Sequence, residues 1–218
     1  MAKKAQENVV QVIPVEVKYV TVTIEGDGDL VLNRMNASNS RQLLADDRKA
    51  QALFEAQHKN KWEDVITSIH WRDGIPTEDT NSECTEEMFY QMLKDNAPCI
   101  SAFGMKKSWG QAVVQNEVDK YSTKFNNAVN IIATGGLVPI RFTEWRLDER
   151  LMSPKRGAPV TTRLNHFIGW SADIQIAYTE HVYSLNEIIT IINYAGFGLG
   201  IGSGRTSGYG RYKVVGVK

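Results

Sequence analysis

The sequence contains seven glycines within residues 196–210, close to its C-terminal end. Glycine adopts positive φ angles freely, but it loses more backbone entropy on folding than any other residue. A run this dense is therefore an unfavourable way to make a plain connection, although a flexible surface loop is one interpretation. The other is a binding surface, because a bare glycine backbone lets another molecule approach and successive N–H groups can form an anion-binding concavity. In both cases the fold must carry a glycine-rich irregular segment here.

Residues 184–195, immediately before the glycine run, have the pattern of a helix. Ser184 is a good N-cap, Glu187 occupies the capping-box position, and apolar residues recur at helical spacing. The run therefore lies at the negative end of a helix dipole, whereas nucleotide-binding loops precede a helix and lie at its positive end. The run also contains no strict G-x-G-x-x-G and no G-K-[ST] motif. These features disfavour a mononucleotide cradle.

The composition is that of a folded protein, and the whole chain, 1–218, is predicted to be a single domain. Cys84 and Cys99 have neither metal-binding nor disulfide spacing, and the four histidines form no metal-binding motif. Neither a metal nor another cofactor is therefore predicted. The N-terminal residues lack the apolar core of a signal peptide, so the expected location is the cytoplasm, or the host cytoplasm if the protein is viral.

Charge is distributed unevenly although the net charge is zero. Residues 1–100 contain 11 Lys and Arg against 17 Asp and Glu, whereas residues 101–218 contain 14 against 8. The zero net charge argues against a histone-like general binder of nucleic acid. A basic second half is nevertheless compatible with a groove that follows phosphates.

Periodicity and capping residues predict the order of the main elements. Predicted strands cover residues 15–25, 136–145, 164–180 and 209–218, and predicted helices cover 40–61, 86–94, a segment after Ser101, and 184–195. Their order is β-α-β-β-α-β, which predicts an α+β, ferredoxin-like or RRM-like fold with helices on one face of the sheet. The acidic, turn-rich residues 64–96 are interpreted as an insertion at the domain edge.

A long basic connection, about residues 146–163, joins the two middle strands. It is far longer than an ordinary hairpin loop and is interpreted as a hairpin thumb that could grip a nucleic-acid backbone, or as a solvated loop. Leu151 and Met152 form an apolar pair within it, and its basic residues are Arg146, Arg150, Lys155, Arg156 and Arg163.

Three features together resemble the RAMP superfamily, whose RRM-like members form the backbone subunits of CRISPR effector complexes. They are the β-α-β-β-α-β order, the glycine run between the second helix and the last strand, and the helix start formed by Pro98, Ser101 and Lys106. The resemblance extends loosely over residues 15–217. It implies nucleic-acid binding, and stand-alone proteins of this kind also occur in phage genomes.

The leading hypothesis is a single-stranded nucleic-acid-binding protein, for DNA or RNA, that coats or polymerises along its ligand as a homo-oligomer. Phosphates are expected to meet the glycine loop, the thumb and the helix after Ser101, while Met152 could wedge between bases. The predicted binding residues are Lys106, Lys107, Arg150, Met152, Lys155, Arg156, Arg163, Gly200, Gly202, Gly204, Arg205 and Arg211. Aromatic side chains of the second half are candidates for base stacking, although most are expected in the core.

Two alternatives remain open at the level of sequence. One is a metal-independent ribonuclease of RAMP type, with His166 or His181 as general base and Arg163 stabilising charge. The other is a viral protein-interaction module that mimics a CRISPR subunit, which only the acidic first half supports. The binder is preferred, and no enzymatic activity is predicted.

Overall fold

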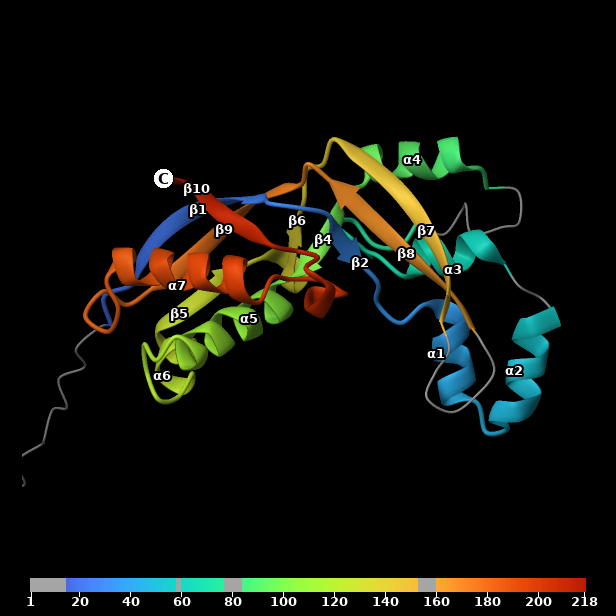
Figure 1. Cartoon of the computed structure of the whole chain (residues 1–218), viewed down its shortest axis with the longest axis horizontal. Coiled ribbons are helices and arrows are strands. Elements are labelled where there is room, and N and C mark those ends of the chain that lie inside the picture. The colour runs from blue at the N-terminus through green and yellow to red at the C-terminus, as the bar shows by residue number, and fades with distance from the viewer. Residues whose placement is uncertain (1–14, 58–59, 77–83, 153–159) are drawn as a thin grey trace, which may run out of the picture.

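The structure, a computed structural model, describes residues 15–57, 60–76, 84–152 and 160–218. A four-stranded antiparallel sheet has the strand order β10-β1-β9-β5. Its strands are β1 (Lys18–Gly26), β5 (Val129–Ile132), β9 (Ser171–Tyr178) and β10 (Tyr212–Val217). Helices α5 (Ala102–Gln115) and α7 (Leu185–Gly198) pack against each other and lie on one face of this central sheet (Figure 1). The predicted α+β class is confirmed, and within the central sheet and its two helices the chain order is β-α-β-β-α-β.

The core follows from the alternation that the sequence shows in the first strand. Val22 and Ile24 have no exposed surface, and Val22 lies opposite Ile174 of β9. Helix α5 contributes Trp109, which is fully buried and whose indole N–H donates to the Tyr212 hydroxyl at 2.9 Å. Burying each large aliphatic side chain stabilises the fold by about 1.5–3 kcal/mol, so these contacts fix the helices on the sheet.

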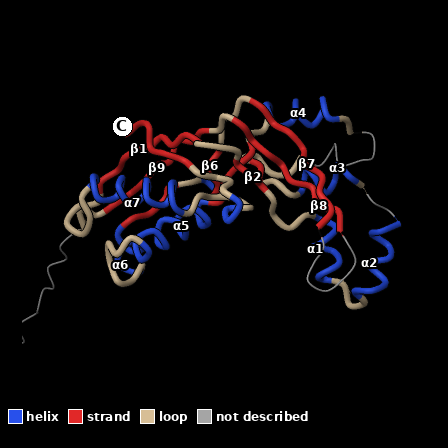
Figure 2. The backbone as a smooth tube through the Cα atoms, viewed as in Figure 1, coloured by secondary structure: helices blue, strands red, loops and turns tan. Residues whose placement is uncertain are grey.

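Two smaller sheets accompany the central one. The first has the order β2-β8-β7 and consists of β2 (Leu30–Leu32), β7 (Glu144–Met152) and β8 (Val160–Ile168). The second has the order β3-β4-β6 and consists of β3 (His70–Trp71), β4 (Pro98–Ser101) and β6 (Leu137–Pro139). Figure 2 shows how the strands continue from the central sheet into the hairpin of β7 and β8.

The prediction assigned the wrong residues to the two middle strands of the central sheet. Residues 136–145 do not form a strand of the central sheet but divide between β6 and β7, and the second central strand is the short β5, which sequence reading missed. Residues 164–180 divide between β8 and β9 at Gly169, which has φ +59°. A Cβ on Gly169 would lie 2.3 Å from the Thr143 hydroxyl oxygen, so only glycine allows this bend.

The interpretation of residues 146–163 as a loop was also wrong over most of its length. Strand β7 extends to Met152 and β8 resumes at Val160, and the two pair in register from Glu144 opposite Ile168 to Met152 opposite Val160. The hairpin was hidden because the charged residues Asp148–Arg150 interrupt the alternation in β7, and because β7 lacks the β-branched residues that mark most strands. The long hairpin itself is confirmed.

Residues 37–95 supply most of the remaining helices, which gather near the β7–β8 hairpin in Figure 1. They are α1 (Ala37–Leu44), α2 (Arg48–Gln57), α3 (Lys61–Thr67) and α4 (Glu86–Asp95). The predicted helix 40–61 is in fact interrupted, because the Asp47 carboxylate accepts from the backbone N–H groups of Lys49 and Ala50, each at 3.0 Å, and starts a new helix. The predicted helix 86–94 is confirmed as α4. Helix α6 (Thr123–Ala128) and 3-10 turns at Thr134–Gly136 and Arg205–Ser207 complete the described elements.

Candidate nucleic-acid interface

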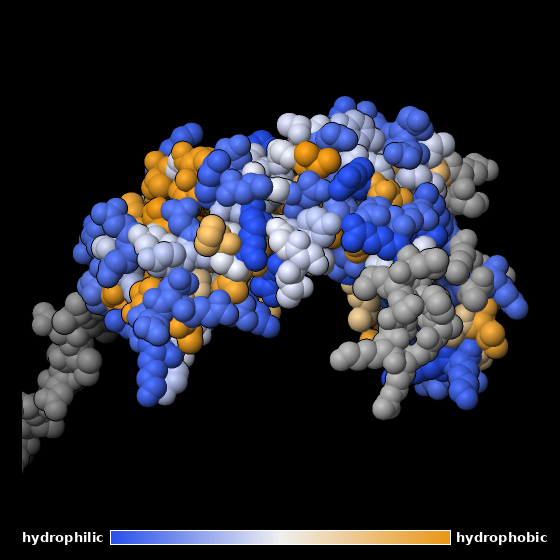
Figure 3. Space-filling view, viewed as in Figure 1, coloured by the Kyte–Doolittle hydropathy of each residue, from blue (hydrophilic) through white to orange (hydrophobic). Residues whose placement is uncertain are grey.

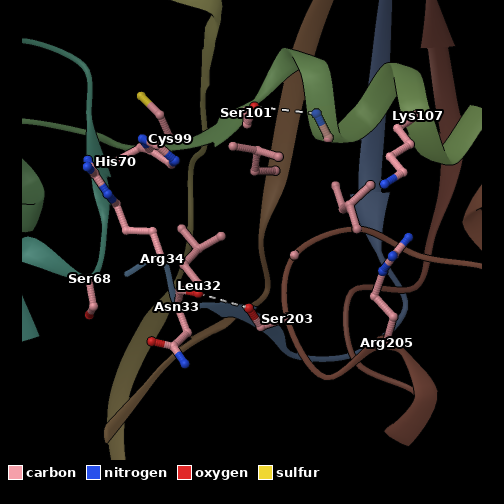
Figure 4. A pocket seen from close by; sticks show the side chains of 14 residues that line it. Leu32, Asn33, Arg34, Ser68, His70, Cys99, Ser101, Lys107, Ser203 and Arg205 are labelled. Atoms are coloured by element: carbon pink, nitrogen blue, oxygen red, sulfur yellow. Dashed lines mark hydrogen bonds between the residues drawn. The ribbon is translucent and has the colours of Figure 1, made fainter. Parts of the chain in front are cut away.

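A pocket of about 230 Å³ lies where the glycine-rich loop meets helix α5 and the segments after β2 and α3. Figure 4 shows its side chains converging from these separate parts of the chain. The pocket is lined by Leu32, Asn33, Arg34, Ser68, His70, Cys99, Ile100, Ser101, Gly104, Lys107, Ile201, Gly202, Ser203 and Arg205. None of these lining residues is acidic.

The glycine-rich loop follows α7 and packs closely on β2. The Ser203 backbone N–H donates to the Val31 carbonyl at 2.8 Å, which joins the loop to the strand. Gly202 has φ +76°, and a Cβ there would lie 2.5 Å from the same Val31 carbonyl oxygen. Gly202 is therefore required by both its backbone conformation and this close approach. The density of glycine in the sequence has a structural cause at this position.

The loop offers fewer free backbone N–H groups than its composition suggests. The N–H of Gly200 donates to the Ala195 carbonyl and that of Gly210 to the Asp29 carbonyl, each at 2.8 Å. Gly200 is also buried, so it cannot meet a phosphate as the sequence predicted. By contrast, the N–H groups of Gly202, Gly204 and Arg205 make no hydrogen bond to any described residue.

The pocket carries positive charge that the described residues do not neutralise. Arg34 and Lys107 are exposed and Arg205 is half-buried. Within residues 15–57, 60–76, 84–152 and 160–218, none of these three cations has a carboxylate within 4.0 Å. In Figure 4, Lys107 of α5 and Arg205 of the glycine-rich loop extend from opposite walls at the same end of the pocket.

Two titratable groups of the pocket are held in their neutral forms. Burial lowers the pKa of His70, and the positive charge of Arg34 lowers it further, so the imidazole is neutral at pH 7. Burial also raises the pKa of the Cys99 thiol to about 11, so this cysteine is a neutral, unreactive part of the wall.

Only some of the predicted binding residues meet at the pocket. Lys107, Gly202 and Arg205 line the pocket together, and Gly204 adjoins it in the loop. Lys106 does not line it: its ammonium donates to the Asn130 side chain at 2.7 Å, and burial lowers its pKa.

The basic residues of β7 and β8 that the structure describes face carboxylates. Arg146 donates to Asp29 at 2.9 Å, and Arg163 lies 3.6 Å from Asp64 and 3.7 Å from Glu149. These distances are consistent with hydrogen-bonded or closely approaching ion pairs, which leave less charge for an external phosphate. Figure 3 shows a strongly hydrophilic surface over the part of the molecule where β7 and β8 lie.

The remaining predicted binding residues do not line the pocket. Arg150 donates to Asp148 and, at 3.2 Å, to the Tyr209 hydroxyl. Arg211 donates to the Arg205 carbonyl at 3.5 Å and is half-buried. Met152 is the last residue of β7, and Lys155 and Arg156 lie outside the described residues.

Sequence reading missed Arg34, Asn33 and His70. The available signal was local: Asn33 and Arg34 directly follow the buried strand β2, and His70 begins the two-residue strand β3. Only the folded chain brings these short segments to the glycine-rich loop.

His166, one of the two histidines proposed as a ribonuclease base, is not arranged for that role with Arg163. His166 has no exposed surface; its Nδ1 lies 3.0 Å from an Asp29 oxygen, and its Nε2 lies 3.6 Å from an Asp148 oxygen. Arg163 and His166 are three residues apart on β8 and therefore face opposite sides of the strand. His181 is exposed after β9.

The aromatic residues considered for stacking are mostly in the core, as expected. Buried members are Trp109, Trp145, Phe167, Trp170, Tyr178 and Tyr212. Phe103, which helical spacing predicts on the apolar face of the helix after Ser101, is instead 78% exposed on α5. It lies next to Gly104 of the pocket and one helical turn before Lys107, so it shares a helix face with this cation.

No group of three or more His, Cys, Asp and Glu residues in the described part of the chain could hold a metal ion. Nor does any helix there combine the length and apolar character needed to cross a membrane.

No protein-family model matches the chain, and no curated protein matches it in sequence. Among solved structures, the chain has similarity at low sequence identity to two Cmr proteins. A chain in the cryo-EM structure of the Type III-B Cmr-beta bound to cognate target RNA has 11% identity and a TM-score of 0.44, and the match covers 93% of this protein and 60% of that chain. Cmr6 from Pyrococcus furiosus has 11% identity and a TM-score of 0.34, with 92% of this protein and 98% of Cmr6 covered.

Proposed function

We propose that this protein binds single-stranded nucleic acid, with phosphates held by Arg34, Lys107 and Arg205 around the pocket. The observation that supports this most directly is that these three cations share one pocket and have no carboxylate partner among the described residues. Phosphates supply the negative charge that such a group lacks, and their contacts with Lys and Arg account for most sequence-independent affinity.

The neighbouring features fit a strand better than an isolated anion. The free N–H groups of Gly202 and Gly204 can donate to phosphate oxygens, and the exposed Phe103 ring offers a surface for an adjacent base. Stacking of a base on an aromatic side chain contributes about 1–3 kcal/mol and is possible with every base.

Binding without catalysis is part of the proposal. The buried position of His166 keeps it from a ribose hydroxyl, and Arg163 lies on the other side of its strand. We also propose that copies of the protein coat a long strand, because one pocket contacts only a short length of backbone.

Fluorescence anisotropy with labelled single-stranded oligonucleotides tests the proposed site. Lys107→Ala and Arg205→Ala should each weaken binding of all sequences alike and make the slope of log affinity against log salt shallower by about 1. Arg150→Ala is the matched control, because Asp148 already pairs with this exposed arginine and its loss should change affinity little.

The same titrations identify failure. Absence of binding at low salt would refute the proposed function. A large effect of Arg150→Ala together with none of Lys107→Ala would move the interface from the pocket to the hairpin.

A further inference from the structure

The pocket contains an apolar floor that a phosphate group does not use. Leu32, Ile100 and Ile201 are 7%, 4% and 2% exposed, and Cys99 beside them is fully buried and neutral. Apolar surface gains free energy only by covering other apolar surface, whereas a phosphate keeps its oxygens in contact with donors and water. These side chains leave a small apolar surface at the floor of the pocket, and an uncharged group covers it better than a phosphate does.

The wall near the floor carries neutral groups with both donors and acceptors. The neutral imidazole of His70 has one donor and one acceptor, and the exposed Asn33 amide has two donors and an acceptor. Neither side chain makes a hydrogen bond to any other residue that the structure describes. They are therefore available to the polar edge of a ligand that lies on the floor.

Charge is placed at the rim of the same pocket. Arg34 acts on His70 from one side, and Lys107 and Arg205 stand at the opposite end in Figure 4. A nucleotide unit presents the apolar face of its base, the hydrogen-bonding edge of the same base and, attached through the sugar, an anionic phosphate. The pocket has a counterpart for each.

We propose that the pocket receives one unstacked nucleobase of the bound strand, while its flanking phosphates lie at the cationic rim. The base would cover Leu32, Ile100 and Ile201 and present its edge to His70 and Asn33. This inference rests on the proposed function and adds to it a subsite that reads a base rather than only the backbone.

The experiment compares an intact oligonucleotide with one of equal length and phosphate number whose bases are replaced by abasic sites. For the wild-type protein the abasic strand should bind about tenfold more weakly or worse, as expected for loss of base contacts. Equal affinity for the two strands would overturn the base subsite while leaving phosphate binding intact. Failure to bind either strand would instead refute the proposed function.

A variant that fills the pocket assigns the effect to it. Asn33→Trp should reduce the ratio of abasic to intact dissociation constants by about tenfold, to near unity if the pocket supplies most of the base contact. Met35→Trp introduces the same ring two residues away, at a 55% exposed position outside the pocket, and should leave the ratio unchanged. An unchanged ratio in Asn33→Trp would overturn the proposal.

Two additional measurements keep the result decisive. His70→Ala should lower the ratio of abasic to intact dissociation constants several-fold, because it removes one hydrogen-bonding contact with the edge of the base. This variant tests the proposal if Asn33→Trp does not fold. A free nucleoside monophosphate should compete with the strand at least about a hundredfold more weakly, because it lacks the flanking phosphates. Competition as strong as that of the strand would make the pocket a mononucleotide site and overturn the proposal.

Discussion

Lys107 and Arg150 are both exposed cations in the basic half of the chain, yet their surroundings differ. Arg150 contacts Asp148 and the Tyr209 hydroxyl, whereas Lys107 has no carboxylate within 4.0 Å among the described residues. A phosphate that approaches Arg150 must compete with an existing partner, while one that approaches Lys107 gains a new one. Sequence position could not fully distinguish these cases, because the Tyr209 hydroxyl comes beside Arg150 only in the folded chain.

His70 makes the pocket sensitive to pH. Its folded-state pKa is lowered by burial and by Arg34, so the unfolded chain binds more protons as the pH falls through the usual histidine value of about 6.5. Its neutral form therefore favours the folded state above that value, and this contribution is lost as the pH decreases. Urea unfolding of the wild type and of His70→Asn from about pH 7.5 to about pH 5 should show a smaller loss of stability in the variant.

The exposed histidine His181 provides the comparison, since His181→Asn should retain the pH dependence of the wild type. Identical pH profiles for the wild type and His70→Asn would contradict the assignment of this effect to His70.

At the scale of elements, the strongly patterned segments could be predicted and the short ones could not. The capping box of Ser184 and Glu187 is present at the start of α7, with the Glu187 side chain accepting from the Ser184 backbone N–H at 2.8 Å. The four-residue β5 has too few residues for a periodic signal, and its position is set by pairing with β9. Strands β3 and β6, which belong to the sheet β3-β4-β6, are shorter still.

The glycines of the loop are predicted to be unequal in their effect on stability. Gly208 has φ +88° and open space where a Cβ would lie, so Gly208→Ala should cost about 1–2 kcal/mol from backbone strain alone. Gly202→Ala adds a contact of 2.5 Å with the Val31 carbonyl oxygen and should be clearly more destabilising. Urea denaturation measures both, and equal losses would contradict the proposed packing of the loop on β2.

This difference also limits which substitutions can test binding. Valine at Gly202 or Gly204 would strain the fold, because Gly204 has φ +67° and its Cβ would lie 2.7 Å from the Tyr209 ring. Loss of binding in such variants would not separate a ligand contact from loop distortion. Lys107 and Arg205 are therefore the sharper positions.

On the scale of the whole molecule, the candidate site is a product of topology. Its lining residues come from four segments of the chain, within 32–34, 68–70, 99–107 and 201–205, which belong to different sheets, to helix α5 and to the loop after α7. The sequence predicted the glycine-rich loop and Lys107 because each lies in a recognisable local pattern. It could not predict Arg34 or His70. Both lie more than a hundred residues before the glycine-rich loop in the chain, and only folding brings them to it.

The size of this site predicts how many copies a long strand should hold. The pocket has a volume of about 230 Å³ and three cations without carboxylate partners among the described residues, which suits a few phosphates and a single base. A nucleic-acid strand several times longer than the segment that one pocket contacts therefore leaves most of its backbone free for further copies of the protein. Light scattering coupled to size-exclusion chromatography should show the mass of the complex rising stepwise with oligonucleotide length. The double variant Lys107→Ala and Arg205→Ala should lose these steps, since each copy binds through the same rim. One copy per strand at every length would contradict coating and leave the protein as a binder of a single short segment.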